Sequence, residues 1–369
     1  MEEGVLITGG AGFIGSHLAD DLLARGYRVR ALDSLVSQVH GATPPDYLAS
    51  DVELVEGDVR DPTVVRRALK GVDAVVHLAA RVGVGQSMYE LSEYAGANSA
   101  GTGVLLEAIL DHPVRKLVVA SSMSVYGEGC YEDGDGNPVE AAERTAEDLE
   151  AGRWDPVDGQ GRPLRPVATH ERKTPALASV YALTKYDQER LCLIFGAAYG
   201  IPTVALRFFN TYGTRQALSN PYTGVLAIFA SRLLNGNRPR VFEDGRQRRD
   251  FVAVRDVVQA CRLALERDGA DGRALNVGTG RDHSVLDVAA KLAGVLGVES
   301  EPDVTGQFRA GDIRHCFADV SLAHRLLGYQ PTVELEDGLA ELAEWLEGQV
   351  AEDHGDAATA ELAARGLTR

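Results

Sequence analysis

Three glycines between a predicted strand and a predicted helix constrain the fold of this chain more than any other feature. A short buried strand is predicted over residues 5–8, Gly9, Gly12 and Gly15 follow at a regular spacing, and a helical pattern begins at Ser16. The first glycine permits a tight turn, the second lets backbone approach a pyrophosphate, and the third lets the helix pack on the strand. The helix N-terminus then faces the phosphates. Because the motif stands between a strand and a helix, it predicts a dinucleotide-binding βαβ unit.

A carboxylate at the end of the second predicted strand indicates which dinucleotide binds. Residues 28–32 form this strand, and Asp33 ends it at about the distance expected for a contact with the adenosine ribose. Because a carboxylate accepts hydrogen bonds from ribose hydroxyls and repels a 2′-phosphate, we expect NAD rather than NADP. An ordinary turn aspartate is the alternative. Asp58, after a third strand, either contacts the adenine amino group or caps the helix that begins near Pro62.

Further apolar strands alternate with helical segments and predict an α/β fold. We expect strands over 74–80, 114–120, 203–210 and 275–278. This order predicts a Rossmann doubly wound parallel sheet with a smaller C-terminal α/β substrate-binding lobe. We assign residues 1–206 and 248–280 to the NAD-binding domain, 207–247 and 281–349 to the substrate-binding lobe, and 350–369 to an acidic helical tail.

Residues 128–178 interrupt the alternation of strands and helices. The segment is rich in Gly, Pro, Asp and Glu. A segment of this length inside a compact domain is usually a lid, a specificity loop or a disordered insertion. We predict a surface insertion near the mouth of the site, and we expect its acidic side chains to be solvated rather than catalytic.

The pair Tyr181 and Lys185 indicates proton chemistry. The two residues are four apart in a predicted helix over 179–199, so they lie on one face, one turn apart. A neighbouring ammonium favours the phenolate and lowers the pKa of a tyrosine. Such a phenol can take a proton from an alcohol. Alone the spacing is weak evidence, because any amphipathic helix can place Tyr and Lys in this way.

Polar side chains at three further places predict ligand contacts. The fifth strand ends in a serine-rich turn, where Ser122 either binds a substrate hydroxyl or only makes local backbone bonds. Phe242 can stack on a base, and the loops that contain Arg249 and Arg309 can bind phosphate. Ordinary surface ion pairs are the alternative for the arginines. His77 is predicted to be a packed strand residue.

Charge and cysteine content restrict the partners of the protein. The net charge of −17 and the pI near 5.0 argue against a general affinity for nucleic acid or an anionic membrane. The four cysteines show no C-x-x-C pair, and the chain has no metal-ligand cluster, signal peptide or transmembrane run. We therefore expect a cytoplasmic protein with reduced thiols and no metal.

Taken together, the motifs resemble one family. The glycine motif, the Ser122 turn, Tyr181-x-x-x-Lys185 and Arg249-Asp250-Phe251 resemble the extended short-chain dehydrogenase/reductases that act on nucleotide sugars, over about residues 4–346. Within this family the chain is similar to the sugar 4-epimerases. The resemblance implies a transient oxidation at C4, in which Tyr181 removes the proton of the hydroxyl, NAD takes the hydride, and the hydride returns to the other face of a 4-keto sugar.

The resemblance also implies a set of site residues. The catalytic residues would be Tyr181, Lys185 and Ser122. The cofactor-binding residues would be Gly9, Gly12, Phe13, Ile14, Gly15, Asp33, Asp58, Val59, Leu78, Ala79, Ala80, Asn98, Tyr181, Lys185 and Phe208. The substrate-binding residues would be Ser122, Ser124, Asn210, Phe242, Arg249, Arg309 and Asp312.

The resemblance leaves several activities open. Residues 179–189 and 215–224 resemble the corresponding segments of family members that act on dTDP-linked 6-deoxyhexoses. This resemblance favours dTDP-L-rhamnose or a related dTDP-6-deoxyhexose as the substrate. A UDP-glucose or UDP-glucuronate 4-epimerase is the first alternative. Met123 and Ser124 stand where related dehydratases and decarboxylases carry carboxylates, which disfavours those activities. A non-catalytic dinucleotide sensor is the alternative from another class. By analogy, the helices over 98–110 and 179–199 would form the interface of a homodimer.

Overall fold

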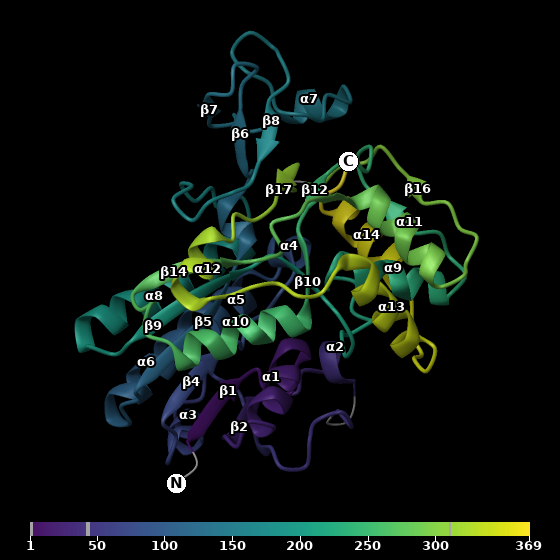
Figure 1. The fold of residues 1–369 in the computed structure, drawn as a ribbon. Coiled ribbons are helices and arrows are strands. Elements are labelled where there is room, and N and C mark those ends of the chain that lie inside the picture. Colours follow the sequence, from purple (N-terminus) through teal and green to yellow (C-terminus); the bar gives the residue numbers. More distant parts are fainter. Residues whose placement is uncertain (1–2, 42–44, 310) are drawn as a thin grey trace.

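A seven-stranded parallel sheet forms the centre of the molecule (Figure 1). The computed structural model describes residues 3–41, 45–309 and 311–369. In order across the sheet, the strands are β3 (Glu53–Glu56), β2 (Arg28–Asp33), β1 (Gly4–Thr8), β4 (Ala74–His77), β5 (Lys116–Ser122), β9 (Thr203–Phe208) and β14 (Arg273–Val277). The order reverses direction between β1 and β4, and at such a switch point the carboxyl ends of parallel strands leave a crevice for a ligand.

Helices cover both faces of this sheet, which confirms the predicted doubly wound fold. Along β1, Val5 and Ile7 face one hydrophobic core while Leu6 faces the other, as the twofold period of a strand requires. The first core is covered by α1 (Phe13–Leu23), α10 (Val254–Glu266) and α12 (Ser321–Leu327), and the second by α3 (Pro62–Leu69), α6 (Gly101–Asp111) and α8 (Val180–Tyr199). Both faces are apolar because both are buried.

Short elements connect these helices and strands. They are α2 (Ser37–His40), α4 (Val84–Ser87), α5 (Leu91–Tyr94), the π-helical turn η1 (Ala95–Ala100) and the 3-10 turn η2 (Met123–Tyr126). The helix predicted over 98–110 therefore begins with a π-helical turn. Ser179 caps α8 as its side chain accepts from the amide of Ala182, so the helix with the Tyr–Lys pair starts where the sequence predicts.

A smaller lobe with its own hydrophobic core stands beside the sheet. The core is formed largely by α9 (Val225–Leu234), α11 (Val285–Val295) and α13 (Leu335–Leu346). Short strands complete the lobe and its connection to the sheet: β10 (Asn210–Tyr212), β11 (Arg240–Val241), β12 (Arg248–Arg249), β13 (Phe251–Ala253), β15 (His283–Ser284), β16 (Asp303–Val304) and β17 (His315–Cys316).

Two details of the lobe differ from the sequence prediction. The strand expected over 203–210 ends at Phe208, and Asn210 begins a separate strand, β10, which pairs with β13. Helix α12 was assigned to the lobe, but Ala323 and Leu327 are buried in the core of the large sheet. The reason is that the chain returns to the sheet after β17, and the apolar face of α12 then covers the end of the sheet beside β14.

The insertion and the tail both lie beside the smaller lobe. Residues 128–178 contain a three-stranded antiparallel sheet, which projects at the top of Figure 1, and a short helix. These elements are β6 (Cys130–Glu132), β7 (Pro138–Val139), β8 (Arg165–Val167) and α7 (Ala146–Glu150). The tail forms α14 (Gly355–Ala364), and Leu362 is buried.

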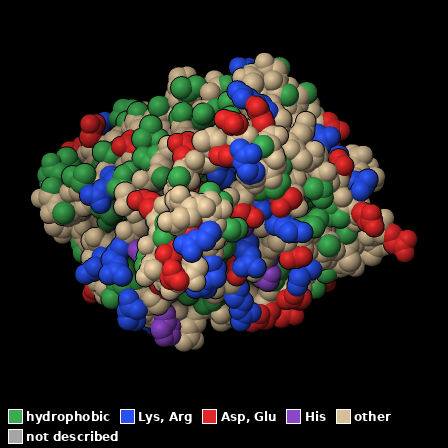
Figure 2. Space-filling model, turned by 90° about the horizontal axis from the view of Figure 1, so that it is seen from above, with side chains coloured by type: hydrophobic (Ala, Val, Ile, Leu, Met, Phe, Trp, Pro, Cys, Tyr) green, Lys and Arg blue, Asp and Glu red, His purple; other side chains and the backbone are tan. Residues whose placement is uncertain are grey.

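The surface carries both signs of charge. In Figure 2, Lys and Arg side chains are interspersed with Asp and Glu side chains and do not gather into a patch of one sign. Of the helices in the described part of the chain, none has the length and apolar character that a membrane span requires.

Candidate active site

A cavity of about 740 Å³ runs from the carboxyl ends of the central strands into the smaller lobe. It is lined by every residue proposed for the site except Asn98. Residues as far apart in sequence as Gly9 and Phe208 therefore meet there, because the parallel strands bring their carboxyl ends to one edge.

The glycine motif forms a cradle that larger residues would fill. Gly9 has a φ of +69°, and a Cβ there would lie 2.9 Å from the amide nitrogen of Ala79. A Cβ on Gly15 would lie 2.2 Å from the carbonyl oxygen of Gly9. Gly12 begins α1, and no side chain caps this helix. The exposed amides at a helix N-terminus suit a pyrophosphate.

The carboxylate of Asp33 is fixed at the end of β2. It accepts hydrogen bonds from the amides of Ala11 and Leu35, both at 3.0 Å, and His40 lies 3.6 Å away. A carboxylate held in the cavity in this way suits ribose hydroxyls and repels a 2′-phosphate. The cradle and Asp33 together fit NAD, which these residues would hold.

Asp58 does not cap the helix that follows it. The N-cap of α3 is Asp61, whose side chain accepts from the amides of Thr63 and Val64. Asp58 instead pairs with Arg60 at 2.7 Å while lining the cavity. The capping alternative is therefore wrong, because Asp61, directly before Pro62, is the residue that caps the helix. The adenine contact remains a prediction.

Tyr181 and Ser122 lie together at the reaction end of the cavity. Burial raises the pKa of Tyr181, and its hydrogen bond with Ser122 opposes that rise. Lys185 is buried, and burial lowers the pKa of its ammonium to about 7. The expectation that Lys185 lowers the pKa of Tyr181 is not met, because burial dominates and Lys185 donates to the Oε1 atom of Gln188, at 2.7 Å.

Gln188 is held by a chain of neutral groups. Its amide donates to the carbonyl oxygen of Ala79 at 3.2 Å and to Oγ1 of Thr102 at 3.0 Å, and lies 3.1 Å from His77. These bonds turn the Gln188 oxygen toward Lys185. His77 is buried, as predicted, and burial lowers its pKa to about 3, so the ring is neutral.

Asn98 does not line the cavity but binds two residues next to it. Its side chain accepts from the amide of Arg81 at 2.7 Å and donates to Thr184 Oγ1 at 3.0 Å. It is fully buried. Its direct contact with the cofactor is therefore not supported, because both polar atoms of the amide are already engaged in positioning Arg81 and α8.

The turn after β5 carries hydroxyls and no carboxylate. Ser124 Oγ donates to Ser122 Oγ at 2.9 Å, and Met123 is buried in the main core. The acidic residues that line the cavity are Asp33, Asp58, Glu93 and Asp312, and none of them lies on this turn. The turn can therefore bind a hydroxyl but offers no additional acid or base.

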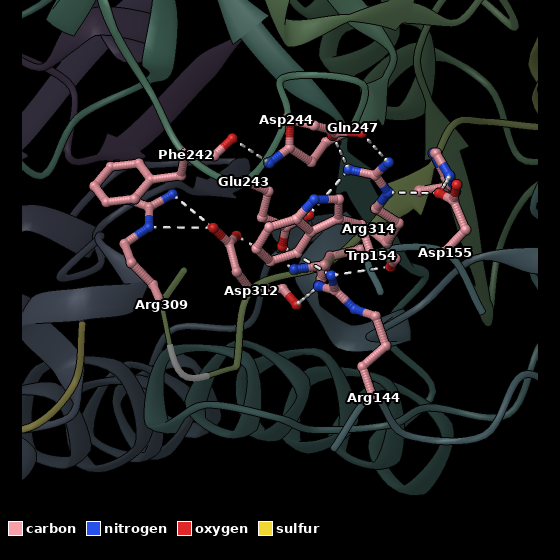
Figure 3. A network of polar contacts seen from close by, with 12 residues as sticks. Arg144, Trp154, Asp155, Phe242, Glu243, Asp244, Gln247, Arg309, Asp312 and Arg314 are labelled. Carbon is pink, nitrogen blue, oxygen red and sulfur yellow. Dashed lines mark hydrogen bonds and ion pairs between the residues drawn. The ribbon is translucent and has the colours of Figure 1, made fainter. Parts of the chain in front are cut away.

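The other end of the cavity presents an aromatic ring and guanidinium groups (Figure 3). The guanidinium of Arg309 lies over the ring of Phe242, 4.5 Å from its centroid, and pairs with Asp312 at 2.8 Å. Arg249 donates to the carbonyl oxygens of Ile313 and Arg314. The Oδ1 atom of Asn210 is buried without a hydrogen-bond partner. An unpaired polar atom and cationic groups around an aromatic ring suit a polar, anionic ligand with a planar base.

Several side chains at the site carried no sequence signal that assigned them a role. They are Gln188, Arg144, Glu243, Arg314, Leu362 and Leu367. Gln188 stands one turn after Lys185, so its helical spacing offered a clue. The prediction that the acidic residues of the insertion are solvated is wrong for Glu128. Its side chain is 16% exposed and accepts from the backbone amide of Arg314, because the insertion folds back onto the smaller lobe. Asp155 also pairs with Arg314, but its side chain remains 52% exposed.

Comparisons with known proteins agree with this geometry. A model described as the NAD dependent epimerase/dehydratase family matches residues 5–278. The dTDP-L-rhamnose 4-epimerase of Burkholderia thailandensis is 38% identical over 347 residues, 93% of this chain and 94% of that protein.

Solved structures show the same similarity along almost the whole chain. The UDP-glucose 4-epimerase of Thermotoga maritima with UDP-glucose has a TM-score of 0.77 and 30% identity, over 93% of this chain and 98% of that one. The UDP-glucuronic acid 4-epimerase of Bacillus cereus, in complex with UDP-glucuronic acid and NAD, has a TM-score of 0.76 and 28% identity, over 93% and 99%. The sequence prediction of an NAD-dependent enzyme is thereby confirmed, and the chain belongs to the NAD dependent epimerase/dehydratase family.

Proposed function

We propose that the protein is an NAD-dependent nucleotide-sugar 4-epimerase that acts on dTDP-L-rhamnose or a related dTDP-6-deoxyhexose. One observation carries this proposal. Tyr181 and Ser122 share one end of the cavity with a turn that has no carboxylate, while Phe242 and Arg309 form the other end. Epimerisation needs a single group that moves one proton, whereas dehydration needs an additional acid and base.

Each group at the reaction end has a distinct proposed task. Tyr181 takes the proton of the sugar 4-hydroxyl and later returns it, and Ser122 orients that hydroxyl. A bound NAD would supply the acceptor, and then the donor, of the hydride at C4 of the sugar. Lys185, which is held by Gln188 at the same end, would contact the nicotinamide ribose of the cofactor. The cradle of Gly9, Gly12 and Gly15 would hold the cofactor pyrophosphate.

The nucleotide end supports a nucleoside diphosphate as the carrier of the sugar. Phe242 would stack on the base, Asn210, Arg249 and Arg309 would bind the diphosphate region, and Asp312 would contact the ribose of the nucleotide. Similarity to the Burkholderia thailandensis enzyme supports a dTDP-6-deoxyhexose. Similarity to proteins named as UDP-glucose and UDP-glucuronic acid 4-epimerases supports the alternative substrates.

A homodimer is part of this proposal. Helices α6 and α8 pack side by side, and exposed apolar side chains stand on them. Leu110, Leu183 and Ile194 are 44%, 52% and 58% exposed. Burial of such side chains in a second copy would be favourable. The division into an NAD-binding domain and a nucleotide-sugar lobe is likewise our proposal, with the sequence-based boundaries except that α12 packs on the large sheet. The cytoplasmic location is also a proposal.

The direct test follows the sugar itself. The purified protein is denatured to quantify released NAD, and native enzyme is incubated with dTDP-L-rhamnose, UDP-glucose and UDP-glucuronate in separate reactions. We expect NMR to show inversion at C4 of dTDP-L-rhamnose at constant mass. Turnover of a UDP-sugar alone would support the alternative. Loss of water or carbon dioxide, or bound NAD without turnover of any sugar, would contradict the proposal.

A further inference from the structure

We propose that Arg144, a residue of the insertion, positions the nucleotide-binding end of the cavity and thereby sets the affinity for the nucleoside diphosphate. This inference rests on the proposed function, because it assumes that Phe242 and Arg309 meet a nucleotide. Arg144 itself does not line the cavity. It is a positioning residue that acts through two segments of the smaller lobe, and Figure 3 shows its guanidinium pointing toward Glu243 and Asp312.

Arg144 joins the insertion to both of these segments. Its Nη1 atom donates to Glu243 Oε1 at 2.8 Å, and its Nη2 atom donates to the carbonyl oxygen of Asp312 at 2.7 Å. Its Nε atom lies 3.3 Å from Glu128 Oε1. One planar guanidinium thus joins the turn that carries Phe242 to the segment that carries Arg309, in addition to the backbone bond from Glu243 to Gln307 at 2.7 Å.

Glu243 follows Phe242 in a backbone conformation that needs support. Its φ is +53°, in the left-handed region that non-glycine residues rarely adopt. Its carboxylate is bridged by Arg144 at Oε1 and by Arg314 at Oε2, the latter at 3.0 Å. Strained backbone persists only where the surroundings determine it and often marks a functional site. The two guanidinium groups therefore hold the turn that presents Phe242 to the cavity.

Asp312 carries the effect of Arg144 to Arg309. The carbonyl oxygen of Asp312 binds Arg144, while its carboxylate accepts from Nε and Nη2 of Arg309 at 3.1 and 2.8 Å. Arg309 then lies over the ring of Phe242. A shift of Asp312 would displace Arg309, so the two groups expected to contact the nucleotide depend on the same anchor.

The tail supports the same segment from a second side. Phe308 exchanges two backbone hydrogen bonds with Arg369, at 2.9 and 3.0 Å, and Thr368 forms a bridge with Arg309. The ring of Trp154, from the insertion, packs against Phe308 at 6.5 Å. The tail thus holds the segment at Phe308, before Arg309. Arg144 holds it at Asp312, after Arg309, where Arg249 binds the next carbonyl oxygen, and we therefore assign a positioning role to Arg144.

Arg144 is buried, and burial increases the contribution of its hydrogen bonds to the stability of the nucleotide end. Its side chain is 7% exposed and that of Glu243 is 1% exposed. Hydrogen bonds between charged groups contribute most where water is excluded, and a planar fork can serve two acceptors that a lysine ammonium serves poorly. We therefore expect the shape of the arginine, and not only its charge, to matter.

The test compares two substitutions at Arg144 with a matched control. Arg144→Met removes the fork and the charge, and Arg144→Lys keeps the charge. Arg153→Met makes the same chemical change at an insertion residue that is 58% exposed and paired with Asp148. For each variant we would measure bound NAD, the Kd of free dTDP and UDP by calorimetry, and kcat and KM for the epimerised sugar.

We expect Arg144→Met to weaken nucleoside diphosphate binding and raise KM by about 10- to 100-fold, with bound NAD unchanged and kcat within about twofold. Arg144→Lys should give an intermediate loss, and Arg153→Met should match the wild-type protein. If Arg144→Met does not fold, the test rests on Arg144→Lys, in which we expect an intermediate loss of nucleoside diphosphate binding.

Two results would overturn the inference. Equal dTDP binding by the wild-type protein and both Arg144 variants would show that the contact does not position the site. A parallel loss of NAD and dTDP binding would show a merely structural role. If the wild-type protein binds neither dTDP nor UDP, the proposed function itself is contradicted, and the inference falls with it.

Discussion

The two ends of the cavity are built from different interactions. At the reaction end, Lys185 donates to the neutral amide of Gln188, which is held in turn by His77, Thr102 and a backbone carbonyl. At the nucleotide end, paired charges surround the turn that follows Phe242 (Figure 3).

The difference shows what each end requires. Burial among neutral groups raises the pKa of Tyr181 and lowers that of Lys185, so it favours the uncharged form of both groups. Paired charges instead fix the loops that meet an anion. Burial raises the pKa of Glu243, and Arg144 opposes that rise. We therefore expect substitutions at the first end to change chemistry and substitutions at the second to change binding or stability.

Tyr181→Phe should abolish most of the catalysis at the reaction end and leave binding at the nucleotide end unchanged. Because the variant lacks the hydroxyl that moves the proton, we expect kcat to fall by about 10²- to 10⁴-fold. Bound NAD and the Kd of dTDP should remain unchanged. Steady-state kinetics, released NAD and calorimetry would measure the three quantities. Tyr199→Phe is the matched control, since this tyrosine ends the same helix and is 60% exposed. Full activity of Tyr181→Phe would contradict the proposed mechanism.

Arg314→Met should lower the free energy of unfolding, because it removes a cation that holds the nucleotide end together. The Arg314 side chain is 1% exposed and pairs with Glu243, Asp244 and Asp155. Of these partners only Glu243 is buried, and it keeps its pair with Arg144, so the cost of breaking a buried pair, about 3–5 kcal/mol, is the upper limit of the effect. We expect a corresponding loss in the free energy of unfolding, measured by urea titration.

The control for Arg314 is the neighbouring Arg248. Its side chain is 49% exposed and pairs with Asp282 at 2.8 Å, so Arg248→Met should change the urea midpoint little. Similar losses in the two variants would show that burial does not distinguish the charges at this end, and the comparison would fail.

Lys185→Met should remove a pH dependence of the free energy of unfolding that arises at the reaction end. The folded-state pKa of Lys185, about 7, lies below the ordinary lysine value of about 10.4. Between these values the unfolded chain binds more protons, so wild-type stability gains up to about 1.4 kcal/mol per pH unit as pH rises. Below about pH 7 both states are protonated, and the penalty for burying the charge is complete.

The measurement follows the stability difference between the two proteins. Urea unfolding of NAD-free wild type and Lys185→Met at about pH 6 to 9 should show a gap that changes in favour of the wild type above about pH 7. A constant gap over the whole range would mean that Lys185 keeps its charge in the folded state and that the neutral surroundings do not tune it.

The sequence predicts the reaction end better than the nucleotide end. Gly9, Asp33 and the Tyr181–Lys185 pair belong to local motifs whose spacing alone places them on a turn, a strand end and a helix face. The central sheet follows from alternating apolar strands. The direction of the Tyr181 shift was missed, because the amount of burial depends on packing from distant segments.

The nucleotide end shows why the rest could not be predicted. Arg144 and Glu243 are 99 positions apart, and Arg144 and Asp312 are 168 apart. Nothing in the composition of the insertion distinguishes Glu128, which binds the backbone of Arg314, from exposed neighbours such as Glu140. Only the folded insertion brings these charges together, since ion pairs carry no periodic pattern.

Arg365→Met tests whether burial, rather than charge pairing itself, separates strong contacts from weak ones. Arg365 lies on the tail, pairs with Glu361 one turn earlier, and stacks over Tyr89 at 4.3 Å. Both members of the ion pair are 46% exposed, so solvent screens them, and such contacts contribute about 0.2–1 kcal/mol. We expect a shift of this size or less in the free energy of unfolding by urea titration, reduced further by salt, with kcat and KM unchanged. A loss as large as that of Arg314→Met would mean that the tail is held by its surface contacts. In that case the surface contacts of Arg365 would help to hold the tail residues that bind Phe308 and Arg309. The interactions that stabilise the nucleotide end would then include those on the outer face of α14.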